Sequence, residues 1–185
     1  METGCGCSPD AGRGTAWRLM GRGPRGVPLE ADPAGAGDAM PKLPDAVHER
    51  IVALCQRGDD LADGGDYAAA LEQYHEAWSL LPDPRDRWEA ASWIQAAIGD
   101  ACFFSGDFEA GSRAFRTAMN SLDAMGNPFL HLRLGQCHYE LGNLPEASDE
   151  LTRAYMLGGD EIFTQEGPKY FAFLKTVLKP PAGGW

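Results

Sequence analysis

The sequence predicts an all-α fold, with three helix-turn-helix hairpins in a row and one C-terminal capping helix. Three copies of one spaced pattern carry this prediction. Each copy has a turn glycine (Gly65, Gly106 or Gly142), followed by a small residue five positions later and a large apolar or aromatic residue nine positions later. A further glycine precedes each turn glycine by seven residues. Because a glycine lacks a β-carbon, these earlier glycines are expected where the two helices of a hairpin approach closely. They are Gly58, Gly99 and Gly135.

This pattern resembles the tetratricopeptide repeat (TPR) of small bacterial proteins, a helix-turn-helix unit with a period of about 34 residues. The turn glycines of this chain lie 41 and 36 residues apart. The second and third units therefore carry insertions of roughly seven and two residues relative to that period. The resemblance covers residues 51–159. It implies a TPR-like right-handed superhelix that binds other proteins and performs no chemistry of its own.

The expected organisation follows the chain in order. Residues 1–42 are rich in Gly, Pro, Ala and Arg without helical periodicity, so we expect a disordered N-terminal segment. Met40 is one candidate for the natural start, and a genuine N-terminal tail is the alternative. Pro82 ends the first hairpin, and the next helix is expected to begin near Arg85. Residues 180–185 are expected to form a flexible tail. The TPR domain, 43–179, is divided into units at 51–84, 85–125 and 128–159 and a cap at 160–179.

Composition and charge narrow the classes of partner. The formal net charge is −11 and the pI is about 4.7, so neither nucleic acid nor an anionic membrane surface is an expected partner. No run of about 18 apolar residues predicts a transmembrane helix. The N-terminus does not have the pattern of a secretory signal. The cysteine count is five, an odd number, which favours reduced thiols in a cytoplasmic protein.

The TPR resemblance also implies a binding groove. In that family the first helix of each hairpin lines a concave surface. Aromatic residues alternate there with carboxylates in this chain, so we expect a protein or peptide that is basic and apolar. The alternative for the aromatic residues, Phe104 included, is an ordinary core position. The candidate groove residues are Asp59, Asp63, Trp93, Asp100, Phe103, Phe129, Arg133, Gln136, Tyr139 and Glu140.

No motif predicts an enzyme. The chain has no Gly-rich phosphate loop, nucleophile elbow or His-Glu-x-x-His helix, and we expect no cofactor and no metal. His131 and His138 could share a helix face with Cys137 beside them. A metal site or a Cys-His nucleophile would also need converging ligands or a third orienting group. The simpler interpretation is that both histidines replace apolar residues of the repeat.

Two specific roles stay open beside that of a general scaffold or adaptor. Segments 127–137, 161–163 and 168–175 are similar to small bacterial repeat proteins of polymorphic toxin loci, which implies an immunity or adaptor protein of a toxin system. The size, the acidity and the three repeats are also similar to secretion chaperones that hold a client in the groove. The sequence fixes neither the partner nor the oligomeric state.

Overall fold

The computed structural model describes residues 42–120 and 126–180, and these residues confirm the all-α prediction. They form seven α-helices and two short 3-10 helices, with no strand among them. None of these helices is long and apolar enough to cross a membrane. The expected disorder of residues 1–42 falls almost entirely outside the described residues, as do positions 121–125 and 181–185. The elements are α2 (Asp45–Asp63), α3 (Tyr67–Ser79), η1 (Arg85–Arg87), α4 (Glu89–Ser105), α5 (Phe108–Ala118), α6 (Pro128–Glu140), α7 (Leu144–Gly158), η2 (Glu161–Phe163) and α8 (Pro168–Val177).

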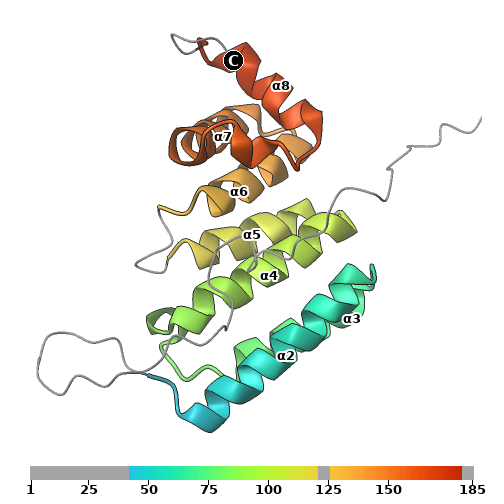
Figure 1. Ribbon diagram of the computed structural model, residues 1–185, viewed down its shortest axis with the longest axis vertical. Helices are drawn as coiled ribbons and strands as arrows, with labels where there is room; N and C mark the ends of the chain where they lie inside the picture. Colours follow the sequence, from blue (N-terminus) through green and yellow to red (C-terminus); the bar gives the residue numbers. More distant parts are fainter. Residues whose placement is uncertain (1–41, 121–125, 181–185) are drawn as a thin grey trace, which may run out of the picture.

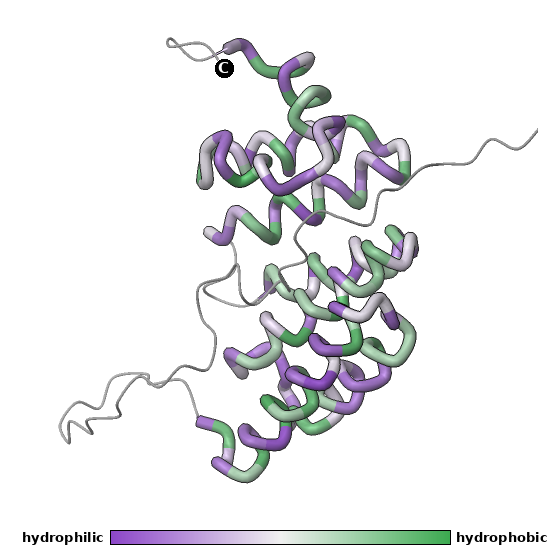
Figure 2. The backbone as a smooth tube through the Cα atoms, turned by 45° about the vertical axis from the view of Figure 1, so that its right-hand side comes forward, coloured by the Kyte–Doolittle hydropathy of each residue, from purple (hydrophilic) through white to green (hydrophobic). Residues whose placement is uncertain are grey.

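The helices pair as three consecutive hairpins. Helix α2 packs on α3, α4 on α5, and α6 on α7. Successive hairpins also touch, because α3 packs on α4 and α5 packs on α6. Figure 1 shows the hairpins stacked in chain order, with α8 beyond α7 at the C-terminal end. Polar and apolar residues alternate along the helices in Figure 2, as expected when one face of each helix is buried.

The predicted glycine contacts are present in all three hairpins. A β-carbon built on Gly58 would lie 2.4 Å from the ring of Tyr74, and one on Gly99 would lie 2.6 Å from the ring of Phe115. At Gly135 it would meet Leu151 at 2.8 Å. These distances are shorter than any normal carbon contact, so the large residue of each α-helical hairpin packs directly on the backbone of the preceding helix.

The turns are built alike in the first two hairpins. Gly65 and Gly106 have φ angles of 83° and 87°, in the left-handed region that favours glycine. The next residue caps the following helix: Asp66 accepts a hydrogen bond from the backbone N–H of Ala69, and Asp107 accepts one from that of Ala110. A glycine followed by a capping aspartate therefore ends one helix and starts the next within three residues.

The second unit begins later than the sequence predicts. The helix expected near Arg85 starts at Glu89, because Arg85–Arg87 form a 3-10 helix and Trp88 is extended. The indole N–H of Trp88 donates a hydrogen bond to the Pro82 carbonyl at 2.7 Å. The residues inserted into this unit thus form a bonded connection and do not lengthen the helix.

The C-terminal helix packs against the last hairpin. Tyr170 and Leu174 of α8 are buried with Leu132 and Leu151, together with Phe163 of η2. Tyr139 of α6 contacts α8 through two aromatic pairs, with ring centroids 5.5 Å from Tyr170 and 5.2 Å from Phe173. Helix α8 therefore covers apolar surface that the third hairpin would otherwise expose.

Candidate functional site

Aromatic rings from three helices meet on one partly exposed surface. Phe104, at the end of α4, is 41% exposed and stacks on Tyr67, at the start of α3, with centroids 6.0 Å apart. Phe103 meets Phe104 edge to face at 5.4 Å. Phe129 of α6 is joined to them by Arg133, whose guanidinium carbon lies 5.1–5.2 Å from the ring centroids of Phe103, Phe104 and Phe129. We call Tyr67, Phe103, Phe104 and Phe129 the aromatic face; Phe129, at 4% exposed, is its buried member.

Arg133 is fixed beneath this face by three hydrogen bonds. Its Nε donates to Asp100 Oδ1 at 2.8 Å, and its Nη1 donates to Glu166 Oε2 at 2.7 Å and to Gln136 Oε1 at 2.8 Å. The residue is only 3% exposed. Burial alone would lower the pKa of the guanidinium, but the charges and hydrogen bonds of Asp100 and Glu166 outweigh it and raise the pKa. The cation therefore stays charged and cannot swing outward without breaking these bonds.

The cluster under the aromatic face has an excess of negative charge. Glu166 accepts a second hydrogen bond, from Gln136 Nε2 at 2.9 Å. One guanidinium thus faces two carboxylates, which gives this cluster a formal charge of −1. Both carboxylate side chains are largely buried, at 9% and 11% exposed. In such a setting the charge acts over a longer range than it would in bulk water.

Two other predicted carboxylates also make internal bonds. Asp59 accepts a hydrogen bond from the Tyr74 hydroxyl at 2.8 Å, within the first hairpin. Burial of Tyr74 and the charge of Asp59 raise the pKa of that hydroxyl. Glu140 accepts one from the Tyr170 hydroxyl at 2.6 Å and pairs with Lys169 at 2.5 Å. Both carboxylates hold the packed helices together in addition to contributing charge.

The structure brings together half of the predicted groove residues. Asp100, Phe103, Phe129, Arg133 and Gln136 form one contiguous cluster. The remaining predicted residues lie elsewhere. Asp63 is exposed at the end of α2, and half-buried Trp93 packs with the first core cluster. Asp59 bonds within its own hairpin, while Tyr139 and Glu140 contact α8.

Sequence reasoning missed two members of the site. Tyr67 is the aromatic residue that follows the first turn, and Phe108 occupies the same position after the second turn. An aromatic residue repeated at this position could have indicated that its ring is packed. Glu166 lies in the connection between η2 and α8, outside the repeats, so no phase of the repeat could have pointed to it.

A pocket of about 590 Å³ adjoins the aromatic face at the start of α6. Phe129 and Leu132 line it from α6, and Ile162 lines it from η2. Glu161 and Glu166 add two carboxylates to the lining. The aromatic face and the pocket have Phe129 in common.

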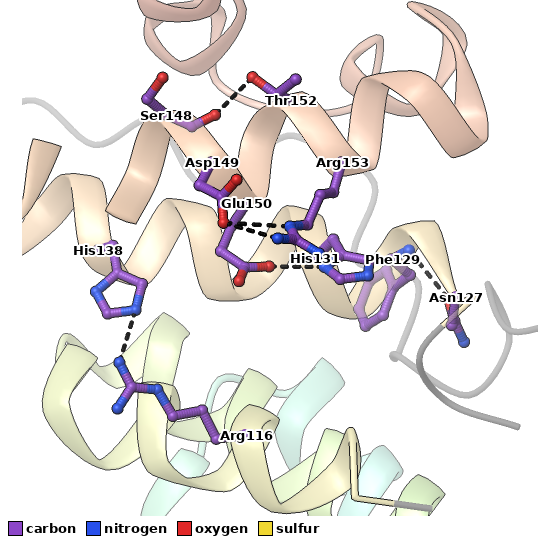
Figure 3. Close-up of polar contacts among 10 residues, drawn as sticks. All are labelled: Arg116, Asn127, Phe129, His131, His138, Ser148, Asp149, Glu150, Thr152 and Arg153. Atoms are coloured by element: carbon purple, nitrogen blue, oxygen red, sulfur yellow. Dashed lines mark hydrogen bonds and ion pairs between the residues drawn. The ribbon is translucent and has the colours of Figure 1, made fainter. Parts of the chain in front are cut away.

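The two histidines of α6 point in different directions. His131 contacts Glu150 of α7 through Nδ1 at 2.6 Å, whereas His138 contacts Arg116 of α5 through Nε2 at 3.1 Å (Figure 3). Burial raises the pKa of the Cys137 thiol to about 12. Within residues 42–120 and 126–180, no three His, Cys, Asp or Glu side chains are arranged to hold a metal ion. Each histidine therefore makes a polar contact to a neighbouring helix.

Neither a protein-family model nor a curated protein matches this chain.

Proposed function

We propose that this chain is a non-enzymatic protein-binding module, built as a TPR-like right-handed superhelix. Its aromatic face would bind a basic, apolar segment of a protein or peptide. The observation that carries this proposal is Phe104. This large apolar side chain is 41% exposed, packs against Tyr67 and Phe103, and lies against the Arg133 guanidinium of a buried, net-negative cluster.

The surroundings of Phe104 suit an interface hot spot. Tyr67 and Phe103 hold its ring from two sides, and Arg133 lies against it. A ring held in this way loses little side-chain entropy when a partner covers it. Aromatic residues in such settings supply much of the free energy of protein association. An apolar partner side chain would therefore gain most by covering Phe104.

The charges around the aromatic face favour a cationic partner. The Asp100–Arg133–Glu166 cluster is net negative, and Asp63 adds an exposed carboxylate at the turn that precedes Tyr67. Glu161 adds another in the adjoining pocket. Lysines or arginines of a partner would gain Coulomb energy here and would associate faster at low ionic strength.

The buried thiols support a binding role over a nucleophilic one. A reactive cysteine needs a lowered pKa. Burial instead raises the pKa of the Cys55 and Cys102 thiols to about 12 and about 11. Free, buried cysteines are also compatible with the reducing cytoplasm, where we place the protein.

Capture of a partner from the native host tests the proposal. The full chain serves as bait beside Phe104→Ala and a matched control, Met156→Ala, which shortens an apolar side chain that is 78% exposed on α7. We expect one dominant partner with wild type and with Met156→Ala, and its loss with Phe104→Ala. Capture that is indifferent to Phe104→Ala would refute the proposed face. The identity of the partner would separate a toxin-immunity role from a chaperone or scaffold role.

A further inference from the structure

The charge of this chain is unevenly distributed. Residues 13–25 contain four of the 16 basic residues, none of the 27 acidic ones, and three large apolar side chains: Trp17, Leu19 and Met20. Residues 45–79, which form the first hairpin, hold eight carboxylates and two arginines. A cationic, apolar segment therefore precedes an acidic hairpin that contributes Tyr67 to the aromatic face.

We propose that residues 13–25 of the same chain occupy the aromatic face and block it until a partner displaces them. This inference rests on the proposed function, because it assigns the first ligand of the same surface. The segment has the chemistry that the face requires: Trp17 offers an aromatic ring to Phe104, and the arginines offer cations to Asp63 and to the cluster around Glu166.

The chain is long enough for the segment to reach the face. Sixteen residues separate Arg25 from Lys42, where the described structure begins, and when extended they can span about 55 Å. The 19 residues of α2 cover about 28 Å from that point to the turn before Tyr67, on which Phe104 stacks. The linker can therefore run the full length of α2 with slack remaining.

Tethering makes even weak binding effective. A ligand joined by a short flexible linker has an effective concentration of about 1 mM at its site. A segment with an intrinsic dissociation constant of about 100 µM would then fill most of the sites and weaken a competing ligand about tenfold. A host partner would bind only if its affinity overcame this competition.

The test compares full-length proteins that differ only in the N-terminal segment. The first variant changes Arg13, Arg18, Arg22 and Arg25 to Gln. The matched control changes four flanking acids, Glu2, Asp10, Glu30 and Asp32, to their amides. The probe is a fluorescein-labelled synthetic peptide of residues 10–28, and its binding is followed by fluorescence anisotropy. We expect the arginine variant to bind the probe at least about tenfold more tightly than wild type or the control.

The outcomes separate this inference from the proposed function. Equal affinity for all three proteins would mean that residues 13–25 do not occupy the face, while the face itself still binds a basic peptide. A probe that binds none of them would overturn the inference, and host capture dependent on Phe104 would then decide the proposed function by itself.

Adding Phe104→Ala to the arginine variant should abolish probe binding, and persistent binding would overturn the assigned site. Wild type that sediments as a dimer, with probe affinity depending on protein concentration, would assign the segment to a second copy and overturn the contact within one chain.

Discussion

Replacing Arg133 by Met removes the cation that Asp100 and Glu166 share while keeping much of the side-chain volume. Arg133 is 3% exposed, and the two carboxylate side chains are 9% and 11% exposed, so water can compensate little. Removing one partner of a buried ion pair costs about 3–5 kcal/mol, because the remaining charge stays buried. We expect Arg133→Met to lower the free energy of unfolding by about that amount at pH 7.

The loss should depend on pH with a definite sign. Without the guanidinium, the buried cluster keeps two negative charges and no cation, so a proton taken up there relieves both the burial penalty and the mutual repulsion. A folded state that binds more protons is stabilised as pH falls, so the deficit relative to wild type should shrink between pH 7 and about pH 5.

Urea unfolding followed by far-UV circular dichroism measures both effects. The control is Arg153→Met, because Arg153 pairs with Asp149 on the exposed face of α7, where side-chain exposures are 55% and 61%. That variant should unfold almost as wild type does. Equal stability of the two variants, or an Arg133→Met deficit that does not change with pH, would refute the buried-cluster argument.

Three further predictions concern packing, titration and reactivity. Gly99→Ala should destabilise the protein, because overpacking against the Phe115 ring costs about 1–3 kcal/mol and opposes a helix-propensity gain of about 1 kcal/mol. The control is Gly64→Ala, whose β-carbon would meet only backbone oxygens, the nearest at 3.2 Å. Thermal unfolding compares the two variants, and equal melting temperatures would contradict the prediction. Burial, and then the charge of Arg116, lower the folded-state pKa of His138, so wild type should lose stability as pH falls below about 6.5. In urea unfolding at several pH values, His138→Gln should lose less stability over this range. Parallel stability curves for the two proteins would show that His138 is not the group responsible. Burial raises the thiol pKa values of Cys55, Cys102 and Cys137 to about 12, 11 and 12. These thiols should therefore resist a maleimide at pH 7 until urea unfolds the chain. Mass spectrometry of the labelled peptides measures the labelling, and rapid labelling of any of the three in the folded protein would contradict the prediction.

The repeated parts of the fold were predictable because their causes are local. A glycine seven residues before each turn and a large residue nine residues after it define one contact, and the structure forms that contact at Gly58, Gly99 and Gly135. The start of α4 was not predictable in the same way. It depends on the hydrogen bond from Trp88 to Pro82, which lies in inserted residues with no counterpart in the other units.

The candidate site was only half predictable. The phase of the repeat placed Asp100 and Arg133 on the same side of successive hairpins, but it could not show that they bond to each other. Charge patterning along the chain does not separate an exposed carboxylate such as Asp63 from a buried, bonded one such as Asp100. Glu166 completes the cluster from a non-repeating connection, so only the folded chain shows it.

The binding role of the aromatic face is tested most directly by nuclear magnetic resonance. Phenylalanine and tyrosine side chains of the full-length arginine variant would be isotope-labelled and titrated with the peptide of residues 10–28. The proposed site predicts that the largest shift changes occur at Phe104 and Tyr67, with smaller ones at Phe103 and Phe129. Shift changes concentrated at Tyr155 and Phe171, on α7 and α8, would contradict it.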